Sequence, residues 1–246
     1  IVKLGSLYYI TYAFRTFMPG RYWEGKPFVK PDFPLEEDLP NGLKWNLTNT
    51  GLAVTKDLIH FKKLGRITDY NTDNRDVILF PRKINGKYYR LERPMEWVGK
   101  EYGCDVPSIW INSSPNLMEW PKPKLLATPL ESWEKKKMGG STPPLETEAG
   151  WLTIYHGVSE TDGCYRVGIM LLDLNDPTKI LARTKDFVME PEFPYETEGY
   201  YNGCVFPTGN VIVGDTLYLY YGGADRFVNV ATASVAAIFE HLKKNK

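Results

Sequence analysis

The sequence has no excess of charge of either sign. Its 246 residues include 30 lysines and arginines and 30 aspartates and glutamates, so the formal net charge is zero. Outside the C-terminal tail, the longest basic run is Lys135-Lys136-Lys137. Binding to nucleic acid or to an anionic membrane depends on a concentrated basic surface. We therefore expect neither a nucleic-acid nor a membrane partner.

Cysteine and long apolar runs are also scarce. The three cysteines, Cys104, Cys164 and Cys204, are widely spaced and form no C-x-x-C pair, which argues against a disulfide framework and against a thiol metal or redox site. We expect them to be small buried side chains, and we expect no cofactor. The sequence contains no signal-peptide pattern and no apolar run of about 20 residues, the length that a membrane helix needs. A cytoplasmic location is the resulting expectation.

Aromatic residues and turn formers are abundant, and they recur at a fixed period. Aromatics make up 14% of the chain, with 21 glycines and 18 prolines, a composition typical of short strands and tight turns. Pro81, Pro144 and Pro207 lie 63 residues apart, and each precedes a short strand, a glycine-containing turn and a second, apolar strand. This arrangement predicts a β-hairpin in each repeat.

A second repeated element alternates with the first. Residues 55–61 resemble residues 114–120, and residues 173–178 form a looser copy; each indicates a polar turn. Two hairpins per repeat make a four-stranded unit, which is the blade of a β-propeller. The alternative is a β-sandwich with coincidental spacing. We predict an all-β chain, with residues 1–246 forming a single propeller domain of about four blades.

Both ends and one insertion complete this organisation. Residues 1–9 resemble residues 82–89, so the chain begins inside a strand, and we expect a first blade to precede it because a propeller closes its ring. Residues 17–47 are rich in turn formers and have no strand periodicity, which predicts a long insertion loop. We expect this loop to shape one side of a functional site, where an acceptor would bind, or to form an oligomer contact. Residues 234–244 predict a short C-terminal helix with Ser234 as its N-cap.

The repeat also predicts a site. The residues twelve positions beyond the three prolines are Arg93, His156 and Leu219. Equivalent positions in successive blades face a common centre, so we expect Arg93 and His156 to converge, with Asp225 close by. Arg75, at the start of a strand, adds a second guanidinium.

Two arginines and a histidine around one cavity suit a tetrahedral oxyanion. Two alternatives stay open. The arginines could pair with neighbouring carboxylates such as Asp76 or Glu92, and His156 could be a histidine of the core.

The chain resembles glycoside hydrolase family 130, the inverting β-mannoside phosphorylases. The resemblance is carried by residues 74–86, 93–94, 133, 137–140, 143–144, 150–158, 171–174 and 220–225. It implies a five-bladed propeller with the active site in its central funnel.

The resemblance also implies roles for six residues. Arg75, Arg93 and His156 would hold phosphate, and Lys137, Tyr165 and Asp225 would line the sugar site. For the last three the alternatives are a solvated lysine, a core aromatic and a turn aspartate. The general acid would be an aspartate in an Asp-Pro-Arg-like motif just upstream of Ile1, so the chain as given should lack its catalytic acid and its activity.

The implied reaction splits a β-mannoside disaccharide or oligosaccharide with inorganic phosphate. The products would be α-mannose 1-phosphate and a shortened sugar acceptor, with inversion and with no metal or cofactor. Alternatives are a β-mannoside hydrolase on the same fold, a non-catalytic carbohydrate-binding propeller and a protein-interaction propeller. A homo-oligomer is compatible with each of them.

Overall fold

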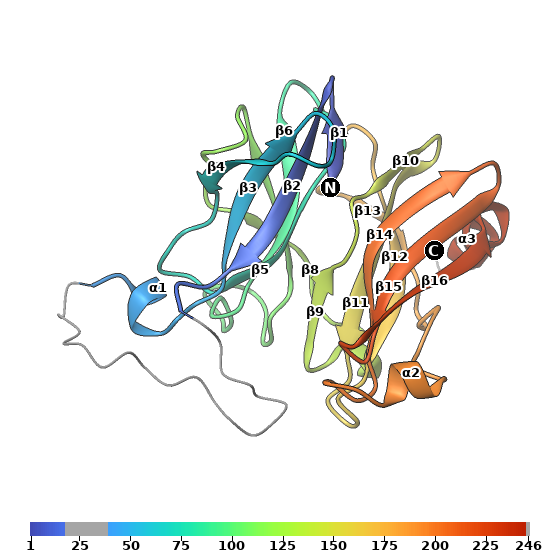
Figure 1. Ribbon diagram of the computed structural model, residues 1–246. Coiled ribbons are helices and arrows are strands. Elements are labelled where there is room, and N and C mark those ends of the chain that lie inside the picture. The colour runs from blue at the N-terminus through green and yellow to red at the C-terminus, as the bar shows by residue number, and fades with distance from the viewer. Residues whose placement is uncertain (18–38, 245–246) are drawn as a thin grey trace.

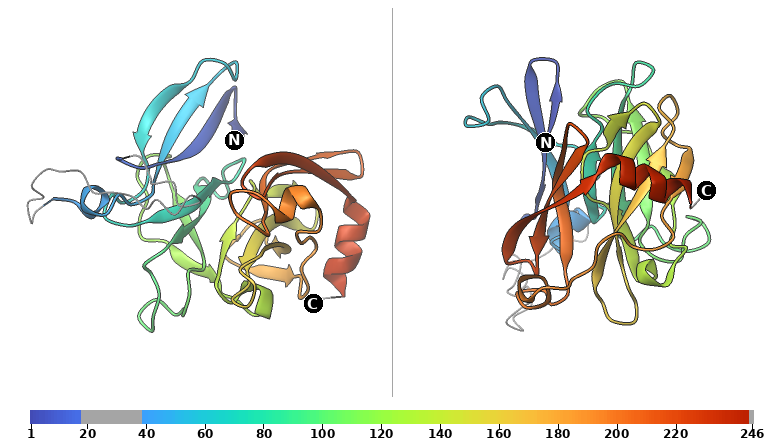
Figure 2. Two further views of the ribbon diagram at one scale, coloured as in Figure 1. Left: turned by 60° about the horizontal axis from the view of Figure 1, so that its bottom comes forward. Right: turned by 90° about the vertical axis from the view of Figure 1, so that its right-hand side faces the viewer.

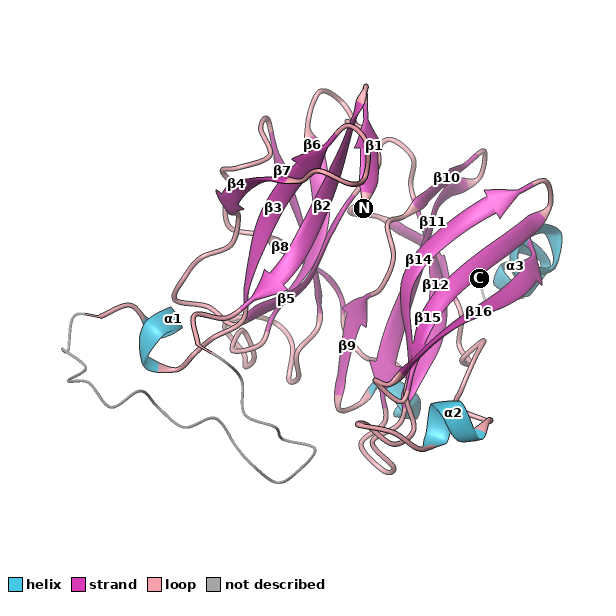
Figure 3. Ribbon diagram, viewed as in Figure 1, coloured by secondary structure: helices cyan, strands magenta, loops and turns pink. Residues whose placement is uncertain are grey.

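The computed structural model of the protein describes residues 1–17 and 39–244, and within them the regular structure is almost entirely antiparallel β-sheet (Figure 3). The all-β prediction is confirmed. Most of the expected insertion, residues 18–38, lies outside the described residues. Its last part, residues 39–47, is described and contains the short helix α1 (Asn41–Lys44).

Four separate sheets follow one another along the described part of the chain (Figure 1). The first comprises β1 (Val2–Leu4), β2 (Leu7–Phe14), β3 (Asn49–Thr55) and β4 (Lys62–Arg66). The second comprises β5 (Asn74–Leu79), β6 (Tyr88–Pro94), β7 (Ile109–Ser114) and β8 (Lys124–Ala127). In the third, β9 (Lys137–Gly140) and β10 (Leu145–Thr147) both pair with β11 (Gly150–Val158), which is followed by β12 (Tyr165–Leu172) and β13 (Ile180–Arg183). The fourth has three strands, β14 (Val205–Val213), β15 (Thr216–Gly223) and β16 (Phe227–Ser234).

The four sheets surround a common axis, as the blades of a propeller do (Figure 2). A cavity of about 180 Å³ is lined by residues from all four of them. Val2 belongs to the first sheet, Ile78 to the second and Thr208 to the fourth, and Ser141 directly follows β9 of the third. The innermost strands therefore meet at the axis, and the chain forms four propeller blades.

The second repeated element is the turn between the last two strands in each of the first three blades. In each copy one side-chain oxygen accepts hydrogen bonds from the backbone N–H groups two and three residues further on. Asp57 Oδ1 is 3.0 and 2.8 Å from the two nitrogens, Asn116 Oδ1 is 2.9 and 2.8 Å away, and Asp173 Oδ1 is 2.8 Å from both. The shared feature is an Asx turn, which explains why Asp and Asn recur there.

The hydrophobic core is divided between the facing sides of neighbouring blades. Leu52 and Leu79 lie in the cluster between the first two blades, and Phe80 and Trp151 pack edge to face, 5.3 Å apart, between the second and third. The cluster between the third and fourth blades extends beneath the C-terminal helix. Each blade thus buries its apolar side chains against the next one, which fixes the inner strands relative to one another.

The C-terminal helix α3 (Val235–Lys243) agrees with the prediction. Ser234 is its N-cap, and its hydroxyl accepts a hydrogen bond from the backbone N–H of Ala237 at 3.3 Å. Ile238 and Leu242 are buried against the third and fourth blades. Two shorter helical turns, η2 (Ser132–Glu134) and α2 (Pro194–Thr197), lie in loops. Across residues 1–17 and 39–244, the structure contains no helix with the length and apolarity to cross a membrane.

Candidate functional site

The candidate site begins at the first two strands of the second blade. Arg75 on β5 and Arg93 on β6 are direct partners in the antiparallel register, so their side chains leave the same face of the sheet. The register then shifts between Arg75 and Ile78, placing both Asp76 and Val77 opposite Glu92. This β-bulge turns Asp76 out of the regular alternation. Its φ of 53° lies in the left-handed region, which Asp tolerates better than most residues.

Arg93 and His156 meet at the centre of the site, although 63 residues separate them. Arg93 Nη1 lies 2.9 Å from His156 Nε2 and 2.8 Å from Asp76 Oδ2. The same carboxylate oxygen is 3.5 Å from His156 Nε2. The His156 side chain is fully buried and only 4% of the Arg93 side chain is exposed. The convergence predicted from the repeat is therefore present, and so is the predicted alternative partner, Asp76.

Arg75 lies at the more open side of the cluster. Its Nε and Nη2 donate to the two carboxylate oxygens of Asp73, at 2.9 and 2.7 Å, and 34% of its side chain is exposed. Its positive charge still acts on the buried groups: it opposes the burial that raises the pKa of Asp76, and it adds to the burial that lowers the pKa of Lys137. One of the two arginines is thus accessible to solvent and the other is enclosed.

Lys137 and Tyr165 form the next layer. Lys137, the first residue of β9, places its Nζ 5.1 Å from the centre of the Tyr165 ring, a cation–π geometry. Burial, with Arg93 and Arg75 nearby, lowers the pKa of Lys137 to about 8. The Tyr165 ring lies 5.5 Å from the imidazole of His156. Both residues therefore belong to the cluster around Arg93.

Asp225 lies in the turn of the hairpin that β15 and β16 form. Ala224 and Asp225 have φ values of 50° and 55°, and Arg226 N–H donates to Gly223 O at 3.0 Å, as in a type I′ turn. Ala224 N–H donates to Cys204 O at 2.9 Å, which ties this turn to the segment that pairs with Tyr165. Leu219, the third member of the repeated position, instead lies in the apolar core between blades.

Gly139 makes the close approach possible, a role that the sequence analysis missed. A Cβ on Gly139 would collide with Asp76 Oδ2 and would lie 2.7 Å from Arg93 Nη1 and 2.8 Å from His156 Cε1. The sequence signal was the Gly139-Gly140 pair within a strand, since glycine inside a strand often marks a close approach. Ser141 was missed as well, and its Oγ lies 3.0 Å from His156 Nδ1.

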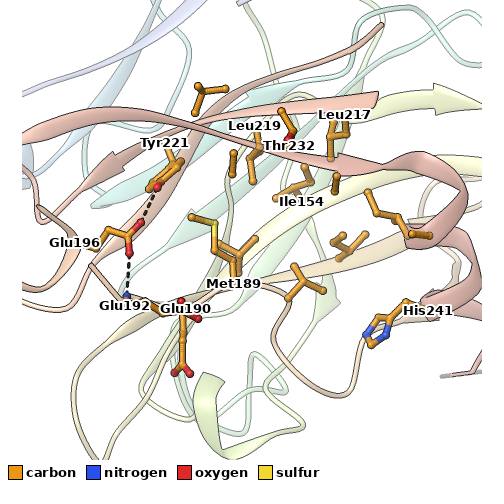
Figure 4. A pocket seen from close by; sticks show the side chains of 18 of the residues that line it. Ile154, Met189, Glu190, Glu192, Glu196, Leu217, Leu219, Tyr221, Thr232 and His241 are labelled. Atoms are coloured by element: carbon orange, nitrogen blue, oxygen red, sulfur yellow. Dashed lines mark hydrogen bonds between the residues drawn. The ribbon is translucent and has the colours of Figure 1, made fainter. Parts of the chain in front are cut away.

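Ser141 connects the buried cluster to the propeller axis, because it also lines the axial cavity of about 180 Å³. A larger cavity of about 520 Å³ lies elsewhere, between the third and fourth blades and beneath α3. Figure 4 shows its mainly aliphatic lining, with Tyr221 donating to Glu196 at 2.6 Å. No arginine lines that cavity, whereas the cluster around Arg93 contains two arginines, a lysine and a histidine.

Comparisons with known proteins show the family of the chain. Residues 42–244 match the glycoside hydrolase family 130 model, described as β-1,4-mannooligosaccharide phosphorylase. A 1,2-β-oligomannan phosphorylase of Thermoanaerobacter sp. (strain X514) is 41% identical over 181 residues, which are 73% of this chain and 56% of that protein. A β-1,2-mannobiose phosphorylase of Listeria innocua is 39% identical over 194 residues, 78% of this chain and 52% of that protein.

The fold agrees as well. The solved structure of β-1,2-mannobiose phosphorylase from Listeria innocua in complex with β-1,2-mannobiose superposes with a TM-score of 0.77 at 32% identity. The superposition covers 99% of this chain and 59% of the chain in the solved structure. The chain spans about half the length of the curated relatives that it matches. By the sequence match and by the shared fold, this chain belongs to glycoside hydrolase family 130.

Proposed function

We propose that the protein is a glycoside phosphorylase, which cleaves a β-mannoside with inorganic phosphate and inverts the anomeric configuration. The observation that carries the proposal is the meeting of Arg93 and His156 at 2.9 Å, with Arg75 as the register partner of Arg93. Guanidinium groups match the geometry of phosphate oxygens, and Lys137 adds positive charge next to them.

In this reaction a phosphate oxygen attacks the anomeric carbon of the mannosyl unit from the face opposite the glycosidic oxygen. The new C–O bond forms as the glycosidic bond breaks, and its electron pair leaves with the acceptor oxygen, which takes a proton. The products are α-mannose 1-phosphate and a shortened sugar. Phosphate is already an anion and needs no general base, so positioning and charge compensation by Arg75 and Arg93 are the main demands on the site.

We assign the remaining roles as the family resemblance implies. His156 completes the phosphate site, while Lys137, Tyr165 and Asp225 line the sugar site. The proton for the acceptor oxygen would come from an aspartate preceding Ile1. This assignment is supported by the grouping of Lys137 and Tyr165 around Arg93 and by the position of Asp225 in a turn joined to Cys204.

For the substrate, we propose a β-1,2-linked mannoside. Both relatives described above are named for β-1,2-linked mannosides, and they are 41% and 39% identical to this chain. Initial rates of phosphorolysis on β-1,2-mannobiose and on β-1,4-mannobiose would compare the two linkages directly. A faster reaction with the β-1,4 compound would refute this choice.

We further propose that a fifth blade closes the ring between the first and fourth blades. The outer face of the fourth blade presents apolar side chains to solvent, among them Val228 at 87%, Val213 at 61% and Tyr220 at 46% exposure. Exposed apolar faces of this kind mark surfaces that another element covers. A fifth blade at this place in the ring would also carry the proposed general acid, upstream of Ile1, toward the cluster around Arg93.

Phosphate dependence tests the proposed function. With the complete protein, incubation of β-1,2-mannobiose with inorganic phosphate should release α-mannose 1-phosphate and mannose in equal amounts. Omission of phosphate should abolish cleavage. Release of mannose without phosphate would show a hydrolase instead, in which a carboxylate pair such as Asp225 and an upstream acid would activate water.

The pH dependence of anion binding tests the role of Lys137. Its pKa is lowered to about 8, so the ammonium charge is present below that pH and is lost as the pH rises through it. We expect the affinity for sulfate, whose charge does not change in this range, to fall from about pH 8 upward. Calorimetric titration of the Lys137→Met variant should show weaker binding and a smaller decline above about pH 8. A decline of equal size in the variant would assign the effect to another group.

A further inference from the structure

The bulge at Asp76 brings a carboxylate into the place where an anion would bind. Asp76 Oδ2 is 2.8 Å from Arg93 Nη1 and 3.5 Å from His156 Nε2. Only 10% of the Asp76 side chain is exposed, and Gly139 packs against it so closely that no Cβ would fit. The oxygen that faces these two basic residues thus belongs to the protein itself.

The hydrogen bonds of His156 show which proton it carries. A guanidinium can only donate, so Arg93 Nη1 donates to His156 Nε2, which must present its lone pair. Nδ1 then carries the proton and donates it to Ser141 Oγ at 3.0 Å. His156 is therefore neutral here. Burial, together with the charges of Arg93 and Lys137, lowers the pKa of His156 well below its usual value, in agreement with this tautomer.

Charged and titratable groups face Asp76 from every strand that packs against it. They are Arg75 and Asp73 at the start of the second blade, Arg93 on β6, Lys137 on β9, His156 on β11 and Tyr165 on β12. With His156 neutral, Arg93 is the positive group in direct contact with the carboxylate. An incoming phosphate would need the same guanidinium, and two anions side by side in a buried site repel each other.

We propose that Asp76 is the resident anion of the phosphate site. Its carboxylate holds Arg93 in place while the site is empty, and a tetrahedral dianion replaces it at Arg93, after which Asp76 carries a proton taken from solvent. No bond is made or broken except the new O–H bond at Asp76. The inference deepens the proposed function and rests on it, because it requires that the site bind phosphate.

The balance between the two states of Asp76 is set by opposing effects. Burial raises the pKa of Asp76, whereas Arg93, Lys137 and Arg75 lower it. An anion bound at Arg93 would cancel much of that positive charge and would raise the pKa further. Binding should therefore take up one proton at any pH at which Asp76 is ionised in the empty site.

Sulfate binding to the native chain and to Asp76→Asn tests the proposal. Between about pH 5.5 and about pH 7.5 Lys137 stays charged, so Asp76 dominates the titration, and linkage predicts up to about a tenfold loss of wild-type affinity per pH unit above the pKa of Asp76. Asp76→Asn should bind sulfate with no such slope and, at any pH at which Asp76 is ionised in the empty site, more tightly than the wild type. Asp73→Asn is the matched control. It removes the carboxylate paired with Arg75 and should keep the slope.

A second measurement does not depend on how the variants fold. The wild-type binding enthalpy, measured in the pH range in which the affinity slope appears and in buffers of different ionisation enthalpy, should reveal about one proton taken up per sulfate. Sulfate binding with no proton uptake, or weaker binding by a folded Asp76→Asn chain, would overturn the role of Asp76 and leave the phosphate site standing. Failure of every variant to bind sulfate or phosphate at any pH would overturn both the inference and the proposed function.

Discussion

Replacement of Arg93 by alanine should abolish measurable phosphate binding. Arg93 is the group that contacts both His156 and Asp76, and its side chain is almost completely enclosed. A charge-assisted hydrogen bond contributes about 1.5–3 kcal/mol, so loss of a two-pronged contact should weaken binding by about 100-fold or more. Isothermal titration with inorganic phosphate would measure the change.

Two further variants separate this effect from a loss of stability. Arg93→Ala also leaves Asp76 without its ion-pair partner, which in a buried pair costs about 3–5 kcal/mol of folding free energy. Arg93→Lys keeps a positive charge beside Asp76 but lacks the planar fork, so it should be more stable and still bind phosphate weakly. Arg82→Ala, which breaks an exposed pair with Glu146, should bind normally. Wild-type phosphate affinity in a folded Arg93→Ala chain would refute the site.

The Gly139→Ala variant should disrupt the same site by adding a methyl group where there is no room for one. The added methyl group would overlap Asp76 Oδ2 and crowd Arg93 and His156, all three of which are held by their own contacts. Overpacking usually costs about 1–3 kcal/mol, and displacement of a buried ion pair adds to that. We expect a loss of about 3 kcal/mol or more in the free energy of unfolding, measured by urea denaturation, together with loss of phosphate binding.

Gly209→Ala is the matched control for this variant. A Cβ on Gly209 would meet only Tyr220 Cβ, at 3.8 Å, an ordinary van der Waals distance. Its stability and phosphate binding should stay close to those of the wild type. If Gly139→Ala behaved in the same way, the tight packing around Asp76 would not be a requirement of the site.

Much of the fold could be predicted from the sequence because the same local physics recurs in each blade. Turn prolines, glycine turns and Asx turns all depend on residues close together in the chain, and Asp57, Asn116 and Asp173 make the same hydrogen bonds in three blades. The helix cap at Ser234 is local too. The fourth blade has three strands among the described residues, whereas the 63-residue repeat predicted four strands in each blade.

The site was predictable only in outline. Rotational equivalence predicted the approach of Arg93 to His156, since it follows from the repeat itself. The position of Asp76 between them depends on a bulge that shifts the register, and no sequence period encodes such a shift. The tautomer of His156 depends on Ser141 and Arg93 together, and the space for Asp76 depends on a missing side chain at Gly139. These features arise from tertiary packing.

The most direct test is a crystal structure of the protein with inorganic phosphate bound. Our account predicts a tetrahedral density at the inner strands, with oxygens within hydrogen-bonding distance of both Arg75 and Arg93, and with the Arg93–Asp76 ion pair of 2.8 Å broken. Phosphate bound at some other surface, with Arg93 still paired to Asp76, would contradict it.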